Sequence, residues 1–202
     1  MSRKTQRSQT GKGFNQFRVI GGRWRGQRFD FPQVIAIRPT PDRVRETLFN
    51  WLQADIGDAR CLDLFAGSGA LGLEALSRGA VFVQFVDLEY AVCQNIGSHL
   101  QRLGAQNANV QSMSGQQYLQ NVAEPFDIIF LDPPFHQNMI YPLCHDLDKK
   151  GWLSSRALIY LESEMAVDSE QLPSELWRIH RRKQAGQVHY TLIHYSTGQV
   201  SP

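Results

Sequence analysis

The segment Cys61-Leu-Asp-Leu-Phe-Ala-Gly-Ser-Gly-Ala-Leu-Gly72 predicts a buried strand that turns sharply into a helix. Its apolar start is typical of a strand inside a parallel sheet. The three glycines have the spacing G-x-G-x-x-G, which lets the backbone approach a nucleotide closely. The next apolar run ends at Asp87, twenty residues after Gly67, where a carboxylate can accept hydrogen bonds from ribose hydroxyls. We therefore predict a nucleotide or nucleoside cofactor.

Apolar runs alternate with helix-like stretches over most of the chain. Strands are predicted at 61–65, 81–86, 109–111, 126–131 and 157–161, and helices at 69–78, 89–103, 115–122 and 137–149. This alternation indicates an α/β fold, with a parallel sheet covered on both faces. Two more strands, at 177–182 and 188–195, flank a turn that contains Gly186. They predict a terminal hairpin with an antiparallel last strand.

The segment 17–31 contains two short β-prone runs around Gly21, Gly22 and Gly26, which predict a hairpin. A lone hairpin is marginally stable in water, so it must pack on the main domain or fold on its partner. After it, Thr40 or Asp42 is expected to cap a helix that starts near Pro41. The helix is expected to bury an apolar stripe of Val44, Leu48, Trp51 and Leu52.

Positive charge is concentrated near the N-terminus, although the whole chain has a net charge of only +2. Residues 1–45 hold eleven Lys and Arg side chains against two Asp. Arginine makes bidentate phosphate contacts, so residues 16–45 predict a polyanion-binding surface. A solvated, disordered tail explains residues 1–15 equally well. Trp24, between two arginines, either stacks on a base or anchors the hairpin.

Several classes of protein are excluded by composition. No apolar run reaches the ~18 residues that a membrane span needs, and the basic N-terminus lacks the apolar stretch of a secretory signal. The three cysteines, Cys61, Cys93 and Cys144, are widely spaced and predict free thiols in a reducing cytosol. We therefore expect a cytoplasmic protein without a metal site. Nothing in the sequence indicates an obligate dimer, so we expect a monomer.

Asp63 helps to distinguish between possible cofactors, because the glycine spacing alone would also permit NAD. This carboxylate lies four residues before Gly67. It would repel the pyrophosphate of a dinucleotide but attract the amino and sulfonium groups of S-adenosylmethionine. The alternative is a carboxylate that only caps the turn. The residue favours S-adenosylmethionine.

A second motif follows the strand at 126–131, where the chain continues as Asp132-Pro133-Pro134-Phe135. The prolines lack N–H donors, so the segment presents acceptors only. Such an array suits an exocyclic amine of a nucleobase, because bonds to Asp132 and the Pro133 carbonyl would aim the nitrogen lone pair. Phe135 could stack on the base, and positioning and electrostatics would supply most of the rate. The alternative is a strand-ending turn with Asp132 as a cap and Phe135 in the core.

The two motifs together resemble the class I S-adenosylmethionine-dependent methyltransferases that act on exocyclic amines. The segments Arg18–Gly26 and Arg38–Asn50 narrow the resemblance to the RsmD-type methyltransferases, which methylate the 2-amino group of a guanine in bacterial 16S (small-subunit) ribosomal RNA. The resemblance runs from about residue 17 to residue 195. It implies a Rossmann-like, seven-stranded, mostly parallel sheet with an antiparallel last strand. We divide the chain into a disordered basic tail (1–16), a basic β-hairpin extension (17–37) and a methyltransferase catalytic domain (38–202).

The resemblance also implies roles for individual residues. It assigns catalysis to Asp132, Pro133, Pro134 and Phe135. It assigns cofactor binding to Arg38, Thr40, Arg43, Asp63, Phe65, Ala66, Gly67, Ser68, Gly69, Asp87, Leu88, Ser114, Gly115 and Asp132. It assigns RNA binding to Arg18, Arg23, Trp24, Arg25 and Arg28. Ser114 departs from the family pattern, because related enzymes commonly carry Asp or Asn there to bind the adenine amino group.

Three other functions remain open at this stage. A DNA adenine N6-methyltransferase would use the same Asp-Pro-Pro-Phe site, although 202 residues leave no room for a long target-recognition insertion. A nicotinamide oxidoreductase would use the same glycine loop. A non-catalytic RNA-binding assembly factor for the ribosome would need neither motif for its function. The substrate of the favoured reaction is either ribosomal RNA alone or the assembled small subunit.

Overall fold

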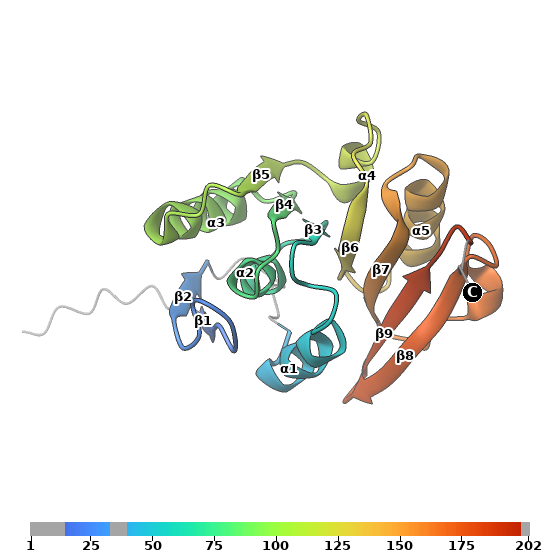
Figure 1. The fold of residues 1–202 in the computed structure, drawn as a ribbon, viewed down its shortest axis with the longest axis horizontal. Helices are drawn as coiled ribbons and strands as arrows, with labels where there is room; N and C mark the ends of the chain where they lie inside the picture. Colours follow the sequence, from blue (N-terminus) through green and yellow to red (C-terminus); the bar gives the residue numbers. More distant parts are fainter. Residues whose placement is uncertain (1–14, 33–39, 199–202) are drawn as a thin grey trace, which may run out of the picture.

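A seven-stranded sheet forms the centre of the protein in the computed structural model, which describes residues 15–32 and 40–198 (Figure 1). Its strands are β3 (Arg60–Asp63), β4 (Phe82–Asp87), β5 (Ala108–Ser112), β6 (Phe126–Leu131), β7 (Leu153–Ser163), β8 (Trp177–Ala185) and β9 (Val188–Tyr195). They lie in the order β5-β4-β3-β6-β7-β9-β8. The strands from β5 to β7 pair in parallel, whereas β9 is antiparallel to both β7 and β8.

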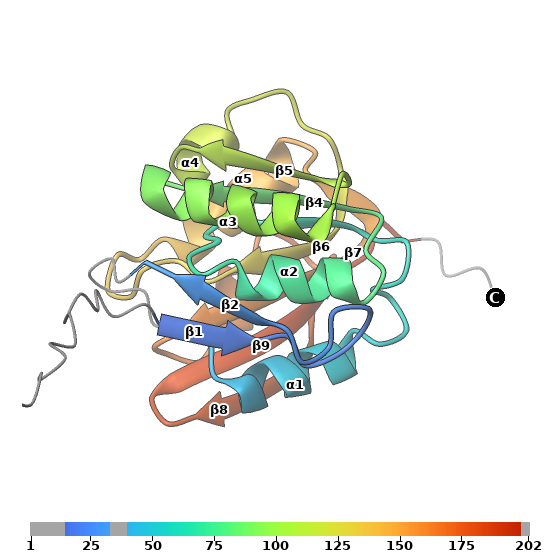
Figure 2. The ribbon, with the colours of Figure 1, turned by 90° about the vertical axis from the view of Figure 1, so that its left-hand side faces the viewer.

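Helices cover both faces of this sheet. They are α1 (Asp42–Trp51), α2 (Ala70–Ser77), α3 (Tyr90–Leu103), α4 (Gly115–Tyr118) and α5 (Ile140–Lys149), with a short 3₁₀ turn at Ser169–Gln171. Figure 2 shows α1, α2 and α3 on one face, together with an N-terminal hairpin of β1 (Asn15–Arg18) and β2 (Arg28–Phe31). One core cluster lies under these elements, and a second lies under α4 and α5. No helix in the described ranges is both long and apolar enough to cross a membrane.

The α/β fold with a parallel sheet, an antiparallel last strand and an N-terminal hairpin is confirmed. The element at 126–131 matches its predicted bounds, because all of its residues except Asp127 are apolar and buried. The bounds of β7 are wrong in the prediction: the strand starts at Leu153 rather than 157, since Leu153 pairs with Phe126 before a bulge. Helix α4 is also shorter than predicted and ends at Tyr118.

The hairpin packs on the domain through backbone donors and aromatic rings. The backbone N–H groups of Ile20 and Gly21 donate to the carboxylate of Glu74 on α2, each at 2.8 Å. Beyond them, the Trp24 N–H donates to Ser77 Oγ at 2.9 Å, and the Trp24 side chain is only 7% exposed. Of the two alternatives for Trp24, the structure therefore shows the anchor.

The predicted side-chain cap of α1 is wrong. Pro41 occupies the N-cap position, and no side chain caps the helix. The Thr40 hydroxyl instead donates to Glu162 at the end of β7, at 2.9 Å. Asp42 pairs with the buried Arg45, at 2.6 Å, and a buried guanidinium needs such a partner more than the helix needs a cap. The apolar stripe of α1 is present, with Leu48 and Leu52 fully buried and Trp51 partly buried against Tyr190.

Gly72 allows α2 to pack closely on the sheet. A Cβ atom at this position would lie 2.1 Å from the buried ring of Phe85 on β4. We expect Gly72→Ala to lower the free energy of unfolding by about 1–3 kcal/mol, because the extra methyl overpacks the core. Denaturant titration measures this change.

Gly97→Ala is the matched control, since Gly97 also lies within a helix but has open space at its Cβ position. It should leave stability unchanged or raise it by up to about 1 kcal/mol, as helix propensity requires. Equal stability of Gly72→Ala and the wild type would contradict the packing argument.

Candidate active site

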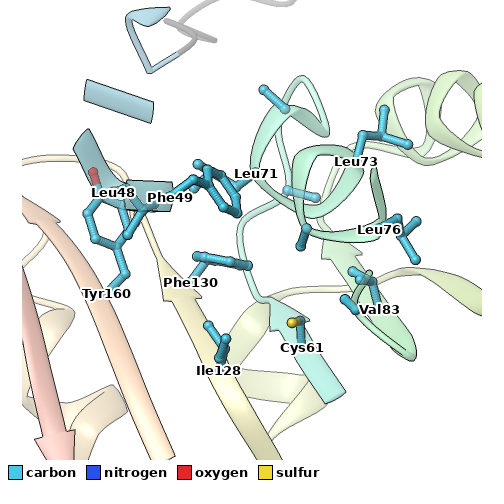
Figure 3. Packing of buried hydrophobic residues seen from close by; sticks show 14 of the residues in the cluster. Leu48, Phe49, Cys61, Leu71, Leu73, Leu76, Val83, Ile128, Phe130 and Tyr160 are labelled. Carbon is cyan, nitrogen blue, oxygen red and sulfur yellow. The ribbon is translucent and has the colours of Figure 1, made fainter. Parts of the chain in front are cut away.

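Four neighbouring strands end in a carboxylate on the same face of the sheet. They are, in spatial order, Asp87 of β4, Asp63 of β3, Asp132 immediately after β6, and Glu162 of β7. Side chains alternate between faces along a strand, so residues two apart share a face. The residue two positions before each carboxylate lies in the core cluster beneath α1 and α2: Phe85, Cys61, Phe130 and Tyr160. Figure 3 shows the last three of these on their strands.

The row of carboxylates lies at the carboxyl edge of the parallel strands, where open α/β sheets bind their ligands. Two of its members, Asp63 and Glu162, are about 95% buried or more. Burying several like charges together is unfavourable unless protons or positive ligands neutralise them. The row is therefore suited to a ligand that is cationic and rich in hydrogen-bond donors.

The glycine loop lies over the first half of this row. Asp63 Oδ2 accepts from the Gly72 N–H at 3.0 Å, and Asp87 Oδ2 accepts from the Gly67 N–H at 2.7 Å. Gly67 and Gly69 have φ angles of 50° and 77°, in the left-handed region that favours glycine. The turn-capping alternative for Asp63 is thus present in the structure, and the carboxylate also remains a member of the row.

Burial controls the protonation of the row. It raises the pKa of Asp63 from 3.8 to about 7; the Gly72 N–H opposes the rise, and the charge of Asp87 adds to it. Burial likewise raises the pKa of Asp132 well above its usual value, and the nearby Glu162 and Asp63 add to the rise. Asp63 and Asp132 therefore keep their protons to higher pH than an exposed aspartate does.

Asp132 is followed by two prolines, which lack N–H donors. Pro133 is buried, Pro134 is exposed and Phe135 is half-buried. A cavity of about 480 Å³ lies beside this segment, between the two prolines and the chain that follows β7. Since β6 lies between β3 and β7, Asp132 separates this cavity from the glycine loop.

The remaining predicted cofactor residues are distributed around the glycine loop. Ala66 and Ser68 are buried, Phe65 is half-buried, and Leu88 and Arg43 are exposed. Arg38 lies outside the described residues. Burial alone does not test whether these residues bind a cofactor, so their assigned roles stay predictions.

Ser114 has a structural role at the start of α4. Its hydroxyl accepts from the Gln117 N–H at 3.2 Å, and its own N–H donates to Gln117 Oε1 at 3.1 Å. This is a capping box, which the Ser-x-x-Gln spacing could have predicted. The next residue, Gly115, is closely packed. A Cβ atom at this position would lie 3.0 Å from the side chains of Leu64 and Phe65.

The predicted RNA-binding arginines of the hairpin are exposed, but they do not gather at the carboxylate row. Arg18, Arg23, Arg25 and Arg28 all face solvent. The Arg23 N–H donates to the carbonyl of Ser77 at 2.7 Å. Ser77 ends α2, whereas the glycine loop begins it. The tip of the hairpin is therefore at the opposite edge of the sheet from Asp132.

Sequence reasoning missed two buried acids, Glu162 and Glu74. Glu162 accepts from the Thr40 and Tyr160 hydroxyls at 2.9 and 2.8 Å. Its signal was available: a carboxylate directly after the apolar run 157–161, at the carboxyl end of a predicted parallel strand. Glu74 lies within an otherwise apolar helix and could have been suspected of pairing with a buried cation. No group of three or more His, Cys, Asp or Glu in residues 15–32 and 40–198 is arranged to hold a metal ion.

Comparison with known proteins finds relatives over nearly the whole chain. "Ribosomal RNA small subunit methyltransferase D" of Escherichia coli (strain K12) is 47% identical over 180 residues, which cover 89% of this chain and 90% of that protein. The protein of the same name from Haemophilus influenzae is 42% identical over 188 residues, covering 91% and 96% of the two chains.

Several solved structures are also similar to this chain. A candidate methyltransferase from Escherichia coli superposes with a TM-score of 0.84 at 45% identity, covering 91% of this chain and all of the other. A candidate methylase from Haemophilus influenzae has a TM-score of 0.76 at 39% identity, covering 90% and 99%. A methyltransferase structure determined with SAH, only 16% identical, shares the fold with a TM-score of 0.66 and covers 83% of this chain and 53% of the other.

A family model also matches, and it covers residues 17–194. Its description is "Conserved hypothetical protein 95". The sheet order and both sequence motifs agree with the resemblance that the sequence carries. The chain belongs to this family, that of the ribosomal RNA small subunit methyltransferase D proteins.

Proposed function

We propose that this protein transfers a methyl group from S-adenosylmethionine to the 2-amino group of a guanine in bacterial small-subunit ribosomal RNA. The observation that carries the proposal is the row of carboxylates Asp87, Asp63, Asp132 and Glu162, which continues into an acceptor-only segment. A sulfonium cofactor supplies positive charge to this row, and an exocyclic amine supplies donors to the segment. Membership of the family supports both assignments.

The glycine loop and its two acids would hold the cofactor. S-adenosylmethionine supplies an activated methyl group when it is bound. Asp63 would stabilise positive charge from beneath the loop, and Asp87, which already orients Gly67, keeps lone pairs for ribose hydroxyls. Thr40 and Arg43 are expected to contact the cofactor from the segment before and within α1. These residues bind and orient, and none of them needs to react.

Asp132 and the Pro133 carbonyl would orient the amine. Hydrogen bonds from its two N–H groups direct the nitrogen lone pair, which in free guanine is delocalised into the ring. Orientation of this kind contributes most of the barrier reduction in such transfers. The methylated nitrogen is acidic and loses its proton. Asp132, whose pKa burial raises well above its usual value, would accept that proton.

The exposed arginines of the hairpin would bind RNA phosphates and extend the contact to the edge of the sheet opposite Asp132. The target guanine must lie in a loop or be unstacked, because a paired amine cannot reach the methyl donor. We place the reaction in the cytoplasm and expect a monomer to carry it out.

Replacing Asp132 tests the reaction directly. We expect wild-type protein to transfer label from S-adenosylmethionine to unmodified small subunits or their RNA, yielding N2-methylguanosine after digestion. Asp132→Ala should lower the rate by at least about a hundredfold, because one preorganised acceptor is lost. Asp55→Ala, which removes an exposed acid after α1, is the control and should keep full activity.

The distribution of label separates the competing functions. Label in methyladenine from duplex DNA would overturn the RNA substrate but keep the site. Cofactor binding without transfer to either nucleic acid would favour an assembly factor. Comparison of subunits with protein-free RNA identifies the natural substrate.

The raised pKa of Asp63 predicts that cofactor affinity depends on pH. Without ligand, the folded state holds the proton up to about pH 7, whereas the unfolded state loses it near pH 3.8, so rising pH destabilises the ligand-free fold over this interval. A cationic cofactor favours the carboxylate. Its association constant should therefore rise up to about tenfold per pH unit below pH 7. Calorimetry from pH 5.5 to 8 measures this. Asp63→Asn should lower the slope by about one proton, and an unchanged slope would argue against contact between Asp63 and the cofactor charge.

RNA affinity should depend on salt through the hairpin. Contact with about six phosphates predicts a loss of roughly a thousandfold in affinity between 50 and 200 mM salt. Replacing Arg23 and Arg25 together with Ala should reduce the slope of log K against log salt by about two. Lys149→Ala, which removes an exposed cation on the other face, should not change it. A slope that the double variant leaves intact would remove the hairpin from the RNA interface.

A further inference from the structure

Glu162 has no role in the transfer step derived above, yet it lies next to the acceptor segment. We propose that Glu162 determines base specificity by accepting a hydrogen bond from N1–H of the target guanine, beside the 2-amino group held by Asp132. This inference rests on the proposed function. It addresses a choice that the Asp-Pro-Pro-Phe segment leaves open, because that segment suits the amines of guanine and adenine equally.

The strand register places Glu162 beside Asp132. Leu131 and Leu161 are aligned partners in the parallel pair β6–β7, and the two acids are the residues that follow them. Neighbouring strands lie about 4.8 Å apart. Two residues earlier, Phe130 and Tyr160 contact each other edge to face with ring centroids 6.5 Å apart (Figure 3). The two acids thus project from the same face of adjacent strands.

The hydrogen bonds of Glu162 hold one oxygen and leave the other for a ligand. The Thr40 and Tyr160 hydroxyls both donate to Oε1, at 2.9 and 2.8 Å. Among the described residues, no group donates to Oε2. Glu162 lines the cavity of about 480 Å³ together with Pro133 and Pro134. A side chain that is only 5% exposed therefore has one oxygen held by two hydroxyl donors, and the residue borders the cavity.

The pKa of Glu162 is raised overall, because burial outweighs the hydrogen bonds from its own partners. Burial raises the pKa of this group, but the hydrogen bonds from Tyr160 and Thr40 act in the opposite direction. A carboxylate can only accept hydrogen bonds. When Glu162 is ionised, it would extend the acceptors that Asp132 and the Pro133 carbonyl offer after the neighbouring strand β6.

Guanine and adenine present opposite patterns to such an array. On its Watson–Crick edge, guanine carries two adjacent donors, N1–H and the 2-amino group, whereas adenine carries an amino donor next to the unprotonated N1. Enzymes that act on an extruded base select it by hydrogen bonds to this edge. Glu162 would satisfy guanine N1–H and would face the N1 lone pair of adenine. A buried acceptor without a donor is costly, so adenine is rejected.

The test exchanges the N1–H group rather than the reacting amine. The small-subunit RNA is prepared with guanine or with 2-aminopurine at the target position, once the labelling assay has identified it. 2-Aminopurine keeps the 2-amino group but has an unprotonated N1 and lacks the 6-oxo group, so the Glu162 variant below is needed to assign the N1 effect. We expect wild-type protein to prefer guanine in kcat/KM by on the order of a hundredfold, as the loss of a hydrogen bond to a charged group predicts.

The variant Glu162→Gln changes the protein partner of the same hydrogen bond. The amide can still accept at one oxygen, and its NH₂ group can donate to an unprotonated N1. We expect the preference for guanine to fall to within about threefold. The preference is a ratio measured on one protein, so a change in cofactor affinity affects both substrates alike. Tyr160→Phe is the matched control, because it removes a donor to Oε1. It should lower kcat/KM for both bases and keep their ratio.

Three outcomes are decisive. Equal rates of wild-type protein on guanine and 2-aminopurine would overturn the inference. So would a Glu162→Gln protein that keeps the wild-type ratio. In both cases N2-methylguanosine would still form, and the proposed function would survive. If wild-type protein methylates no guanine, the proposed function fails, and the role of Glu162 fails with it.

Discussion

A buried ion pair between Arg45 and Glu74 holds three segments of the structure together. Both side chains are fully buried, and their closest charged atoms, Arg45 Nη1 and Glu74 Oε2, lie 3.7 Å apart. Glu74 also accepts from the backbone of the hairpin and, at 2.7 Å, from Arg78. A buried carboxylate is tolerated only when donors surround it in this way. Arg45 completes the connection from α1, where its remaining nitrogens donate to the carbonyls of Thr40 and Arg18.

This ion pair links the hairpin to the carboxylate row. Arg45 fixes the carbonyl of Thr40, and the hydroxyl of the same residue donates to Glu162. One side chain and one residue therefore separate the hairpin from the carboxyl ends of the strands, where the base is expected to bind. A chain of hydrogen bonds thus connects the hairpin with Glu162 at the carboxyl ends of the strands.

Sequence patterns predicted the features that depend on local periodicity, and they failed where distant contacts decide. The continuous apolar run at β6 and the glycine spacing after β3 are visible in a short window, and both were located well. The contact between Thr40 and Glu162 spans 122 residues, so no local pattern reveals it. Thr40 was expected to cap α1 because only its position just before the helix is visible in the local sequence. Trp24 illustrates a further limit: its arginine neighbours suited either an exposed or a buried ring, and only the packing on Ser77 distinguishes them.

The three thiols have low reactivity. Cys61, Cys93 and Cys144 are all buried and free. Burial is the main cause that raises the pKa of each, to about 12 for Cys144. Since the thiolate is the reactive form, these groups resist alkylation and disulfide exchange at neutral pH. A cysteine introduced at an exposed position such as Arg25 would be the one reactive thiol of the chain, and a spectroscopic probe attached there would report on the hairpin without removal of any native cysteine.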